Sequence, residues 1–289
     1  MNIAFFGLGN MGFPIAQNLL RVGHSVTIAV HRDPVPARKL AALDAVVASS
    51  ASEAVRGAEL IFSIVPNDQS LKTLLLDESM LAAVPEGSVI VEMTSSSAEA
   101  VQAVATAYAR KGVSLLDAPV SGGVAGAANA TMSMLCAGDP AIYERVLPVL
   151  KQISKTQCYV GAQPGQGKVV KSLNNLLSAI NKAAVGEAWQ MARANGVDSA
   201  AFFDAISASS GDSAALRAAF PHIRDGNYAA GFTVALMRKD LEIAMALTDG
   251  QTLPLAETVL EYYRRAAPFD QEDSSAVAKV RFGQKGFHV

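Results

Sequence analysis

Three polar side chains interrupt a long apolar segment, at spacings that a helix would bring together. The segment spans about residues 166–195 and contains no Pro, and no Asp or Glu before Glu187. Lys171 and Asn175 lie four residues apart, so a helix places them on one face, with Asn174 beside them. Burying an ammonium group and a carboxamide is costly unless each has a partner, so we take this stretch as the candidate site of the chemistry. A lysine that extends along a core helix into solvent, next to two capping amides, explains the pattern equally well.

A glycine-rich turn near the start of the chain predicts a dinucleotide site. It matches G-x-G-x-x-G, with a strand predicted before it, a helix after it and a second strand over 25–30. The first glycine of this motif permits a tight turn, the second lets backbone approach a pyrophosphate, and the third lets the helix pack on the strand. The amides and dipole of the helix N-terminus attract the anion. The residues predicted to bind the cofactor here are Gly7, Leu8, Gly9, Asn10, Met11 and Gly12.

The end of the second predicted strand bears on which dinucleotide binds. An NAD site usually carries Asp or Glu there, which binds the ribose 2′-hydroxyl. Here the strand leads into His31, Arg32 and Asp33. Arg32 lies where a 2′-phosphate would bind, and its charge and planar set of donors match a phosphate. Asp33 could instead bind the ribose, with Arg32 as a solvated turn residue. We favour NADPH, with NADH as the alternative.

Polar and small residues follow several further predicted strands. Apolar runs at 60–65, 88–93 and 114–116 predict buried strands, and those at 131–137 and 156–160 predict two more. The carboxyl ends of parallel strands line the ligand crevice of a doubly wound sheet. The candidate cofactor neighbours at these strand ends are Val65, Pro66, Ser70 and Ser95. Ordinary turn and helix-cap chemistry explains each of these residues equally well when it is taken alone.

A run of small residues over 117–127 could bind a carboxylate. It has no periodicity, and its small side chains leave backbone amides exposed. Ser121 with Gly122 and Gly123 could form a concave nest of N–H groups, to which the serine hydroxyl adds a donor. A flexible glycine turn is the alternative, and this segment alone favours it.

After residue 160 the pattern changes from alternating strands and helices to helices alone. The hinge lies at 161–165, and helices are predicted at about 166–195, 199–208, 214–220, 233–249, 254–265 and 274–280. We expect an α/β fold with an N-terminal Rossmann domain, a doubly wound parallel sheet, over 1–162. An all-helical substrate and dimerisation domain over 163–289 would be joined to it by a long helix. Because that helix is apolar on more than one side, we expect a homodimer or homotetramer.

Composition narrows the class of protein further. The chain has 289 residues, is 51% hydrophobic and carries a formal net charge of -2, so we expect no nucleic acid and no membrane surface as a partner. No apolar run reaches the length of a membrane span, and because Met1 leads almost directly into a predicted strand we expect no signal peptide. Cys136 and Cys158 form no ligand spacing, and none of the four histidines has the setting of a base or metal ligand. We therefore expect a cytoplasmic enzyme without a metal.

Four stretches, read in order, resemble one protein family. GLGNMG at 7–12, DAPVSGG at 117–123, GKVVKSLNN at 167–175 and KDLEIA at 239–244 are similar in order and spacing to motifs of the 3-hydroxyisobutyrate dehydrogenase (β-hydroxyacid dehydrogenase) family. The resemblance covers essentially the full chain. It implies an NAD(P)-dependent oxidoreductase that interconverts a small β-hydroxy acid and its semialdehyde or keto acid.

The resemblance also implies roles for single residues. Lys171 would be the general acid and base, and Asn175 would hold the substrate oxygen. Lys239 would lie by the nicotinamide ribose or the substrate, although an ion pair on a helix surface explains its position equally well. Val65, Pro66 and Ser95 correspond to cofactor-contacting positions. The residues implied to bind the substrate carboxylate and the remainder of the substrate are Ser121, Gly122, Gly123, Asn174 and Phe232, with Val124 and Leu236.

The chain departs from the family pattern at several positions. Ser95 stands where threonine is usual, Ala130 stands where many members carry glycine, and the segment at 31–32 is one residue longer than the common form. Ser178 stands where the decarboxylating 6-phosphogluconate enzymes carry glutamate, so decarboxylation is not expected.

Two other functions compete with this interpretation. Imine reductases share the architecture but usually replace the lysine with Asp or Tyr, so Lys171 argues against NADPH-dependent imine reduction without removing it as the alternative. A dinucleotide-sensing or nucleosome-reading scaffold without turnover should have lost Lys171 or the loop at 121–123. This chain retains both.

Overall fold

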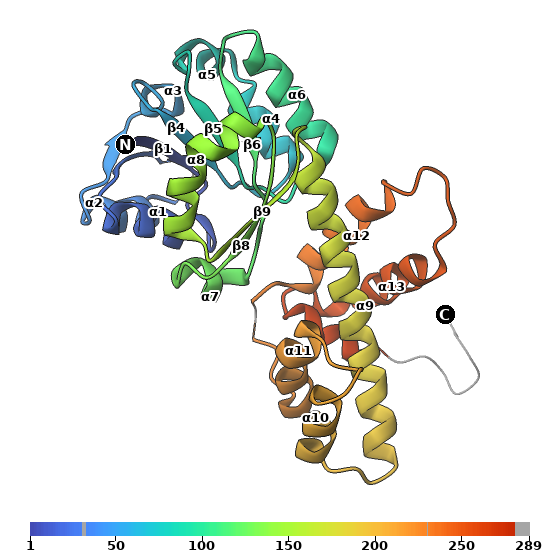
Figure 1. Cartoon of the computed structure of the whole chain (residues 1–289). Coiled ribbons are helices and arrows are strands. Elements are labelled where there is room, and N and C mark those ends of the chain that lie inside the picture. Colours follow the sequence, from blue (N-terminus) through green and yellow to red (C-terminus); the bar gives the residue numbers. More distant parts are fainter. Residues whose placement is uncertain (31–32, 230, 281–289) are drawn as a thin grey trace. The chain divides into compact units, whose positions relative to one another are not determined.

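The computed structural model describes residues 1–30, 33–229 and 231–280. The chain folds as two compact units, Met1–Lys171 and Ser172–Val289. The first unit is an α/β sheet domain and the second is helical, which confirms the predicted fold class (Figure 1). No helix within the described ranges is long and apolar enough to cross a membrane.

One sheet forms the centre of the first unit. Within the described residues its strand order is β3-β2-β1-β4-β5-β6-β8-β7, and β9 pairs with β8. The strands from β3 to β6 in this order are parallel, whereas β8 is antiparallel to β6 and β7. Because β1 lies between β2 and β4, the strand order reverses there, and in doubly wound sheets ligands bind at the carboxyl ends of the strands beside such a reversal. The strands are β1 (Asn2–Phe6), β2 (Ser25–Ala29), β3 (Val46–Ala48), β4 (Leu60–Ser63), β5 (Val89–Glu92), β6 (Ser114–Asp117), β7 (Val120–Ser121), β8 (Ser133–Ala137) and β9 (Thr156–Gly161).

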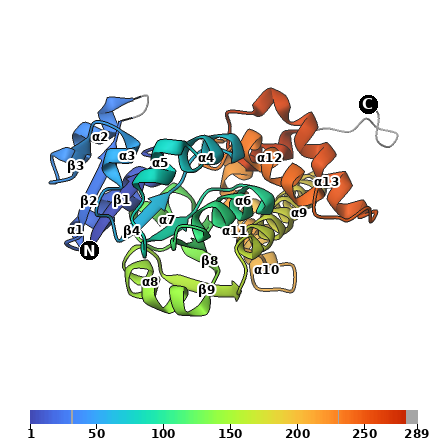
Figure 2. The same cartoon turned by 90° about the horizontal axis from the view of Figure 1, so that it is seen from above.

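Helices cover both faces of this sheet (Figure 2). Side chains alternate along β1, so that Ile3 and Phe5 pack in one apolar core and Ala4 and Phe6 pack in the other. Burial on both faces explains why the parallel strands read as short continuous apolar runs rather than as alternating patterns. The helices of this unit are α1 (Gly12–Arg21), α2 (Pro34–Ala41), α3 (Ala51–Ala54), α4 (Asp68–Leu75), α5 (Glu78–Ala83), α6 (Ala98–Ala109), α7 (Gly123–Ala128) and α8 (Pro140–Ile153).

Local structure differs from the sequence predictions in several places. The segment at 34–54, for which no element was predicted, forms α2, β3 and α3. The sequence pattern over about 70–81 predicts a single helix, but the structure has two, α4 and α5. The Asp77 side chain accepts hydrogen bonds from the backbone N–H groups of Ser79 and Met80 and so caps a new start at α5. The aperiodic loop contains the short helix α7. The final helix predicted at 274–280 is a 3-10 helix, η2.

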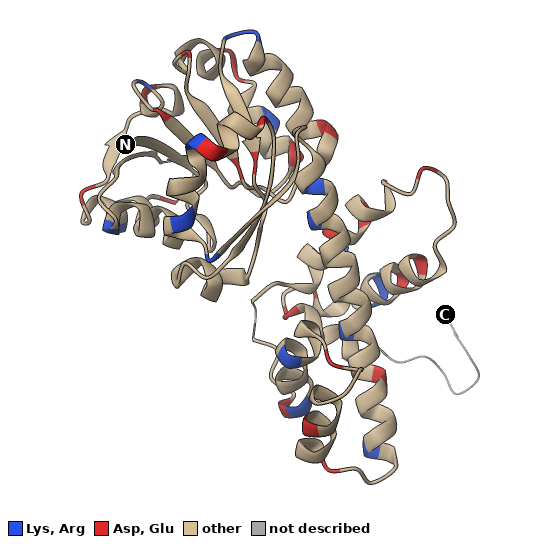
Figure 3. Ribbon diagram, in the orientation of Figure 1, with Lys and Arg blue, Asp and Glu red and all other residues tan. Residues whose placement is uncertain are grey.

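The second unit is built around the long helix α9, which begins in the first unit. Its core packs α9 against α12, α13 and η2. A Cβ on Gly186 of α9 would lie 2.7 Å from the Cβ of Ala278, so glycine permits the close approach of η2. Lys and Arg are interspersed with Asp and Glu over the described ribbon of each unit (Figure 3). The elements are α9 (Gln166–Ala194), α10 (Ser199–Ser207), α11 (Ala214–Asp225), α12 (Val234–Met245), α13 (Pro254–Arg265), η1 (Ala267–Phe269) and η2 (Ser274–Lys279).

Candidate active site

The glycine-rich turn between β1 and α1 leaves open backbone where a pyrophosphate would bind. Gly7 has a φ of 94°, and a Cβ there would lie 1.9 Å from the Ile64 carbonyl oxygen, so only glycine fits. A Cβ on Gly12 would lie 1.7 Å from the Gly7 oxygen, which holds α1 against the turn. In contrast, a Cβ on Gly9 would meet nothing within 4 Å. Met11 provides no side-chain cap and the first turn of α1 holds no acidic residue, so its amides and positive dipole suit an anion. These residues fit the phosphates of a dinucleotide.

One hydrogen bond joins two of the strand ends predicted to adjoin the cofactor. The Val65 backbone N–H donates to Thr94 Oγ1 at 3.0 Å, and Thr94 is fully buried. Val65 directly follows Ile64, whose carbonyl lies against the glycine-rich turn, and Ser95 directly follows Thr94. Val65 and Ser95 therefore belong to one edge of the sheet, beside the turn. Sequence reasoning missed Thr94, although its position at the end of a predicted strand was a usable signal.

Two further cofactor candidates lie at the start of α4. Pro66 is exposed, and Ser70 is half-buried in the first turn of this helix. The Ser70 backbone N–H donates to Asn67 Oδ1 at 2.9 Å, so Asn67 caps the helix. Both candidates follow β4 at the same edge of the sheet as Val65.

The residues predicted to select between NADP and NAD lie partly outside the described structure. His31 and Arg32 are not among the described residues. Asp33, the alternative ligand for the ribose, accepts a hydrogen bond from the Val35 backbone N–H at 2.9 Å and caps α2. One carboxylate oxygen of Asp33 is therefore already engaged with helix backbone.

The predicted carboxylate loop is an ordered turn between β7 and α7. Ser121 pairs with Ser133 in the antiparallel β7–β8 ladder. Gly122 and Gly123 have φ values of 138° and 62°, which glycine adopts without strain. Both glycines are exposed, so the loop can present backbone N–H groups to a ligand. Ala130, which follows α7, has a φ of 54°, in the left-handed region that favours glycine.

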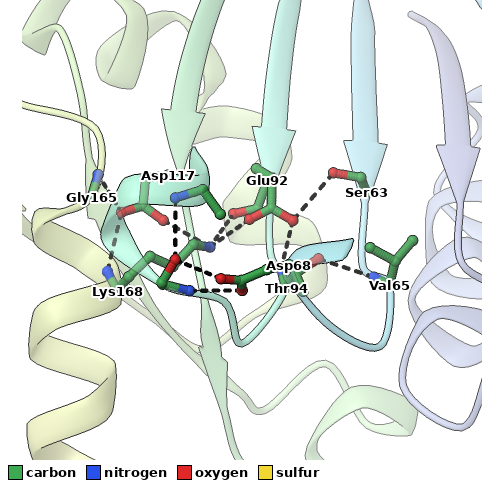
Figure 4. Close-up of polar contacts among 10 residues, drawn as sticks. Ser63, Val65, Asp68, Glu92, Thr94, Asp117, Gly165 and Lys168 are labelled. Carbon is green, nitrogen blue, oxygen red and sulfur yellow. Dashed lines mark hydrogen bonds and ion pairs between the residues drawn. The ribbon is translucent and has the colours of Figure 1, made fainter. Parts of the chain in front are cut away.

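Buried ion pairs hold the start of α9, and sequence reasoning did not foresee them. Lys168 Nζ lies 2.6 Å from Glu92 Oε2 and 2.9 Å from Asp117 Oδ1, and all three side chains are buried (Figure 4). Burial lowers the pKa of Lys168, but the carboxylates of Asp117 and Glu92 outweigh it and raise the pKa above its ordinary value. Lys168 is therefore protonated. The signal in the sequence was an acidic residue at the end of each of two strands that pair in the sheet.

Lys171 lies one turn beyond this network and is the last residue of the first unit. Its side chain is only 8% exposed, so it does not extend into solvent as the alternative interpretation required. Burial of an ammonium group at this position matches the environment of a proton-transfer group.

Asn175, one turn further along α9, takes part in a polar cluster within the second unit. Its Nδ2 donates to Asp240 Oδ2 at 2.5 Å, and its Oδ1 accepts from Asn174 Nδ2 at 3.2 Å. Lys239 Nζ lies 3.2 Å from Asp240 Oδ1. The structure thus brings together Asn174, Asn175 and Lys239, and Asp240 is the residue that joins them. Sequence reasoning noted Asp240 only as the neighbour of Lys239.

The predicted apolar contacts to the substrate differ in exposure. Phe232 is half-buried and packs on the core of the second unit. Leu236 is exposed on α12, and Val124 is exposed on α7 of the first unit.

Two family models match consecutive parts of this chain. Residues 2–161 match the NAD binding domain of 6-phosphogluconate dehydrogenase. Residues 165–281 match the NAD-binding domain of NADP-dependent 3-hydroxyisobutyrate dehydrogenase. Together with the fold and the glycine-rich turn, they define an NAD(P)-dependent dehydrogenase with a Rossmann domain and a helical domain.

Individual relatives are similar along nearly their whole length. The 3-hydroxyisobutyrate dehydrogenase of Pseudomonas aeruginosa is 35% identical over 98% of this chain and 99% of its own. The NAD-dependent L-serine dehydrogenase of the same organism is 32% identical over 96% of this chain and 97% of its own. The solved structure of Mycobacterium tuberculosis 3-hydroxyisobutyrate dehydrogenase with L-serine has a TM-score of 0.89 at 33% identity, covering 96% of this chain and 97% of that one. The chain belongs to the 3-hydroxyisobutyrate dehydrogenase (β-hydroxyacid dehydrogenase) family and is an NAD(P)-dependent enzyme, as its four motifs indicated.

Proposed function

We propose that this enzyme interconverts a small β-hydroxy acid and its semialdehyde or keto acid, with Lys171 as the general acid and base. The observation that carries the proposal is the burial of Lys171 on α9, one turn before Asn175. Asn175 is held on both sides of its carboxamide, by Asn174 and by Asp240. A fixed amide beside a buried ammonium group suits proton transfer to one oriented oxygen.

The substrate class follows from the chemistry that two relatives share. The names of the P. aeruginosa enzymes give 3-hydroxyisobutyrate and L-serine as substrates. Both compounds carry a carboxylate and a hydroxymethyl group on the adjacent carbon. The exposed backbone of Gly122 and Gly123, with the Ser121 hydroxyl, suits the carboxylate. Apolar side chains such as Phe232 discriminate poorly between small acids of this kind, so we propose the class and not one compound.

The residues of this chain would handle the proton and the substrate. When it is bound, the nicotinamide supplies or accepts a hydride. Lys171 Nζ gives a proton to the substrate oxygen in reduction, and in oxidation it must be neutral in order to accept that proton. Asn175 orients this oxygen, and Lys239 lies by the nicotinamide ribose or the substrate.

We further propose NADP(H) as the preferred cofactor and a homodimer or homotetramer as the assembly. Arg32 matches a 2′-phosphate by charge and geometry, whereas one oxygen of the Asp33 carboxylate caps α2. On α9, Leu177 is 62% exposed and Met191 is 69% exposed. Exposed apolar side chains on one long helix support burial against a second subunit.

A panel of substrates tests the proposed activity. Loss of reduced-nicotinamide absorbance would be followed with short semialdehydes whose reduction gives a β-hydroxy acid, with succinic semialdehyde and glyoxylate as γ- and α-position comparisons, and with a cyclic imine in a separate reaction. Oxidation would be tested with β-hydroxy acids. We expect turnover with carboxylate-bearing aldehydes and none with the imine. Turnover of the imine, with none of the acids, would instead establish imine reduction.

A further inference from the structure

The first turn of α9 is fastened to the carboxyl end of β6. One oxygen of Asp117, Oδ2, accepts hydrogen bonds from the backbone N–H groups of Gly165 at 3.0 Å and Lys168 at 3.1 Å. A Cβ on Gly167 would lie 2.5 Å from the Leu135 carbonyl oxygen and 2.8 Å from Asp117 Oδ2. The helix therefore begins in direct contact with strand ends, and its first amides are satisfied by a buried carboxylate.

A second connection runs from the same lysine to the cofactor edge of the sheet. Lys168 Nζ also donates to the Glu92 backbone oxygen at 3.1 Å. Glu92 Oε1 accepts the Thr94 backbone N–H at 2.9 Å and the Ser63 hydroxyl at 3.4 Å. Thr94 in turn receives the hydrogen bond from Val65 described above. An unbroken path of polar contacts thus leads from α9 to the ends of β5 and β4 (Figure 4).

Stability alone does not account for three buried charges. Apolar residues of the same volume often stabilise a fold as well as a buried ion pair does, whereas loss of one partner leaves an uncompensated charge. A network of fixed ion pairs does, however, specify one arrangement of the elements that it joins. Here those elements are the strand ends beside the glycine-rich turn and the turn of α9 that leads to Lys171.

We propose that Lys168 is a positioning residue, which sets the place of Lys171 relative to the bound nicotinamide. This inference rests on the proposed role of Lys171. Its two carboxylate partners have separable effects. Asp117 orders the backbone of α9 and thereby the proton donor, whereas Glu92 orders Thr94 and Val65 and thereby the cofactor site.

Three variants that preserve side-chain volume test the proposal: Lys168→Met, Asp117→Asn and Glu92→Gln. For Asp117→Asn we expect kcat to fall on the order of 10- to 100-fold, with NADPH affinity retained, because a small misplacement of a reacting group has effects of this size. For Glu92→Gln we expect weaker NADPH binding, and for Lys168→Met both losses. In Asp117→Asn and Lys168→Met the solvent deuterium isotope effect on kcat should rise, because transfer of the exchangeable Lys171 proton becomes limiting.

A second lysine on the same helix provides the control. Lys182 Nζ donates to Ser274 Oγ at 2.5 Å, within the second unit. Lys182→Met should leave kcat, NADPH affinity and the isotope effect as in the wild type. If folded Lys168→Met and Asp117→Asn behave like Lys182→Met, the network is structural only and the proposal is wrong.

Hydrogen exchange of the wild-type protein tests one premise of the proposal, that the network is formed before the cofactor binds, even if a variant does not fold. We expect the amides of Gly165 and Lys168 to exchange slowly in the protein without cofactor, because Asp117 already holds them. Fast exchange that becomes slow only with NADPH would overturn the proposal. Neither this measurement nor NADPH affinity requires a substrate. Failure of the whole substrate panel would therefore count against the proposed activity. Hydrogen exchange and NADPH affinity would still test the network around Lys168.

Discussion

Asp240 Oδ2 accepts a hydrogen bond of 2.5 Å from Asn175 Nδ2, and both side chains are buried. The second oxygen of this carboxylate lies 3.2 Å from Lys239 Nζ. One aspartate therefore orients an amide and neutralises a cation, both of which are proposed to face the substrate. A buried polar group that loses its hydrogen-bond partner is left unsatisfied at a cost in free energy, so the amide of Asn175 should depend on Asp240.

Asp240→Asn should lower kcat/KM on the order of 10- to 100-fold, because the Asn175 carboxamide loses the acceptor that fixes its orientation. Steady-state kinetics with the best acid of the panel would measure it. Asp270→Asn is the matched control, since Asp270 pairs with Arg238 at 2.6 Å beside the same helix. That variant should lose stability and keep its kcat/KM. Equal losses in the two variants would contradict a role for Asp240 in orientation.

Lys171→Ala should fold, bind NADPH and lose on the order of 100- to 10,000-fold in kcat, the range expected when a general acid is removed. Cofactor titration and thermal unfolding would establish that the variant is intact. Turnover at the wild-type rate would remove the proposed mechanism.

Gly9→Ala should weaken NADPH binding without loss of stability. The added methyl group meets no protein atom within 4 Å, so its only obstacle is the cofactor phosphate. Gly12→Ala is the contrasting case, because its Cβ would lie 1.7 Å from the Gly7 oxygen and the fold itself must shift. Thermal unfolding and NADPH titration of both variants would separate the two effects. Unchanged affinity in Gly9→Ala would place the pyrophosphate elsewhere.

Arg32→Ala should reduce the preference for NADPH over NADH by roughly 10- to 100-fold in kcat/KM, since hydrogen bonds to a charged group contribute about 1.5–3 kcal/mol. Arg38→Ala, an exposed arginine on α2, should leave the preference unchanged. A preference that survives in Arg32→Ala would show that another residue reads the 2′-phosphate.

The stability that Lys168 contributes should not fall as the pH rises from about 8 to 10. Its pKa is raised in the folded protein above the ordinary value of 10.5, so the contribution is fully present below that value. It is lost only as the pH rises through the folded pKa. Urea unfolding of wild type and Lys168→Met should therefore give a difference in the free energy of unfolding that does not fall as the pH rises from about 8 to 10. A difference that falls as the pH rises through this range would mean that Lys168 is not held protonated.

The sequence predicted those parts of the fold whose conformation is determined by residues close together in the chain. The turn at Gly7 to Gly12 and the start of α9 near Gln166 were recognisable, because glycine spacing and helical periodicity are short-range signals. The split between α4 and α5 was missed, because one capping side chain, Asp77, overrode an otherwise continuous helical pattern.

The contacts that organise the site come from residues far apart in the chain. Asn175 and Asp240 are separated by 65 positions, and Lys168 and Glu92 by 76. No periodicity within a window of 11 to 18 residues, roughly, can report such a pairing. Acidic residues at strand ends were visible in the sequence, but their partner was not.

The unbroken helix α9 passes from the first unit into the second between Lys171 and Ser172. Four residues of a helix rise about 6 Å, so the distance from the proton donor to the orienting amide is set by covalent and helical geometry. One continuous helix therefore carries both the proposed proton donor and the proposed orienting amide, so their spacing along the chain does not depend on any tertiary contact.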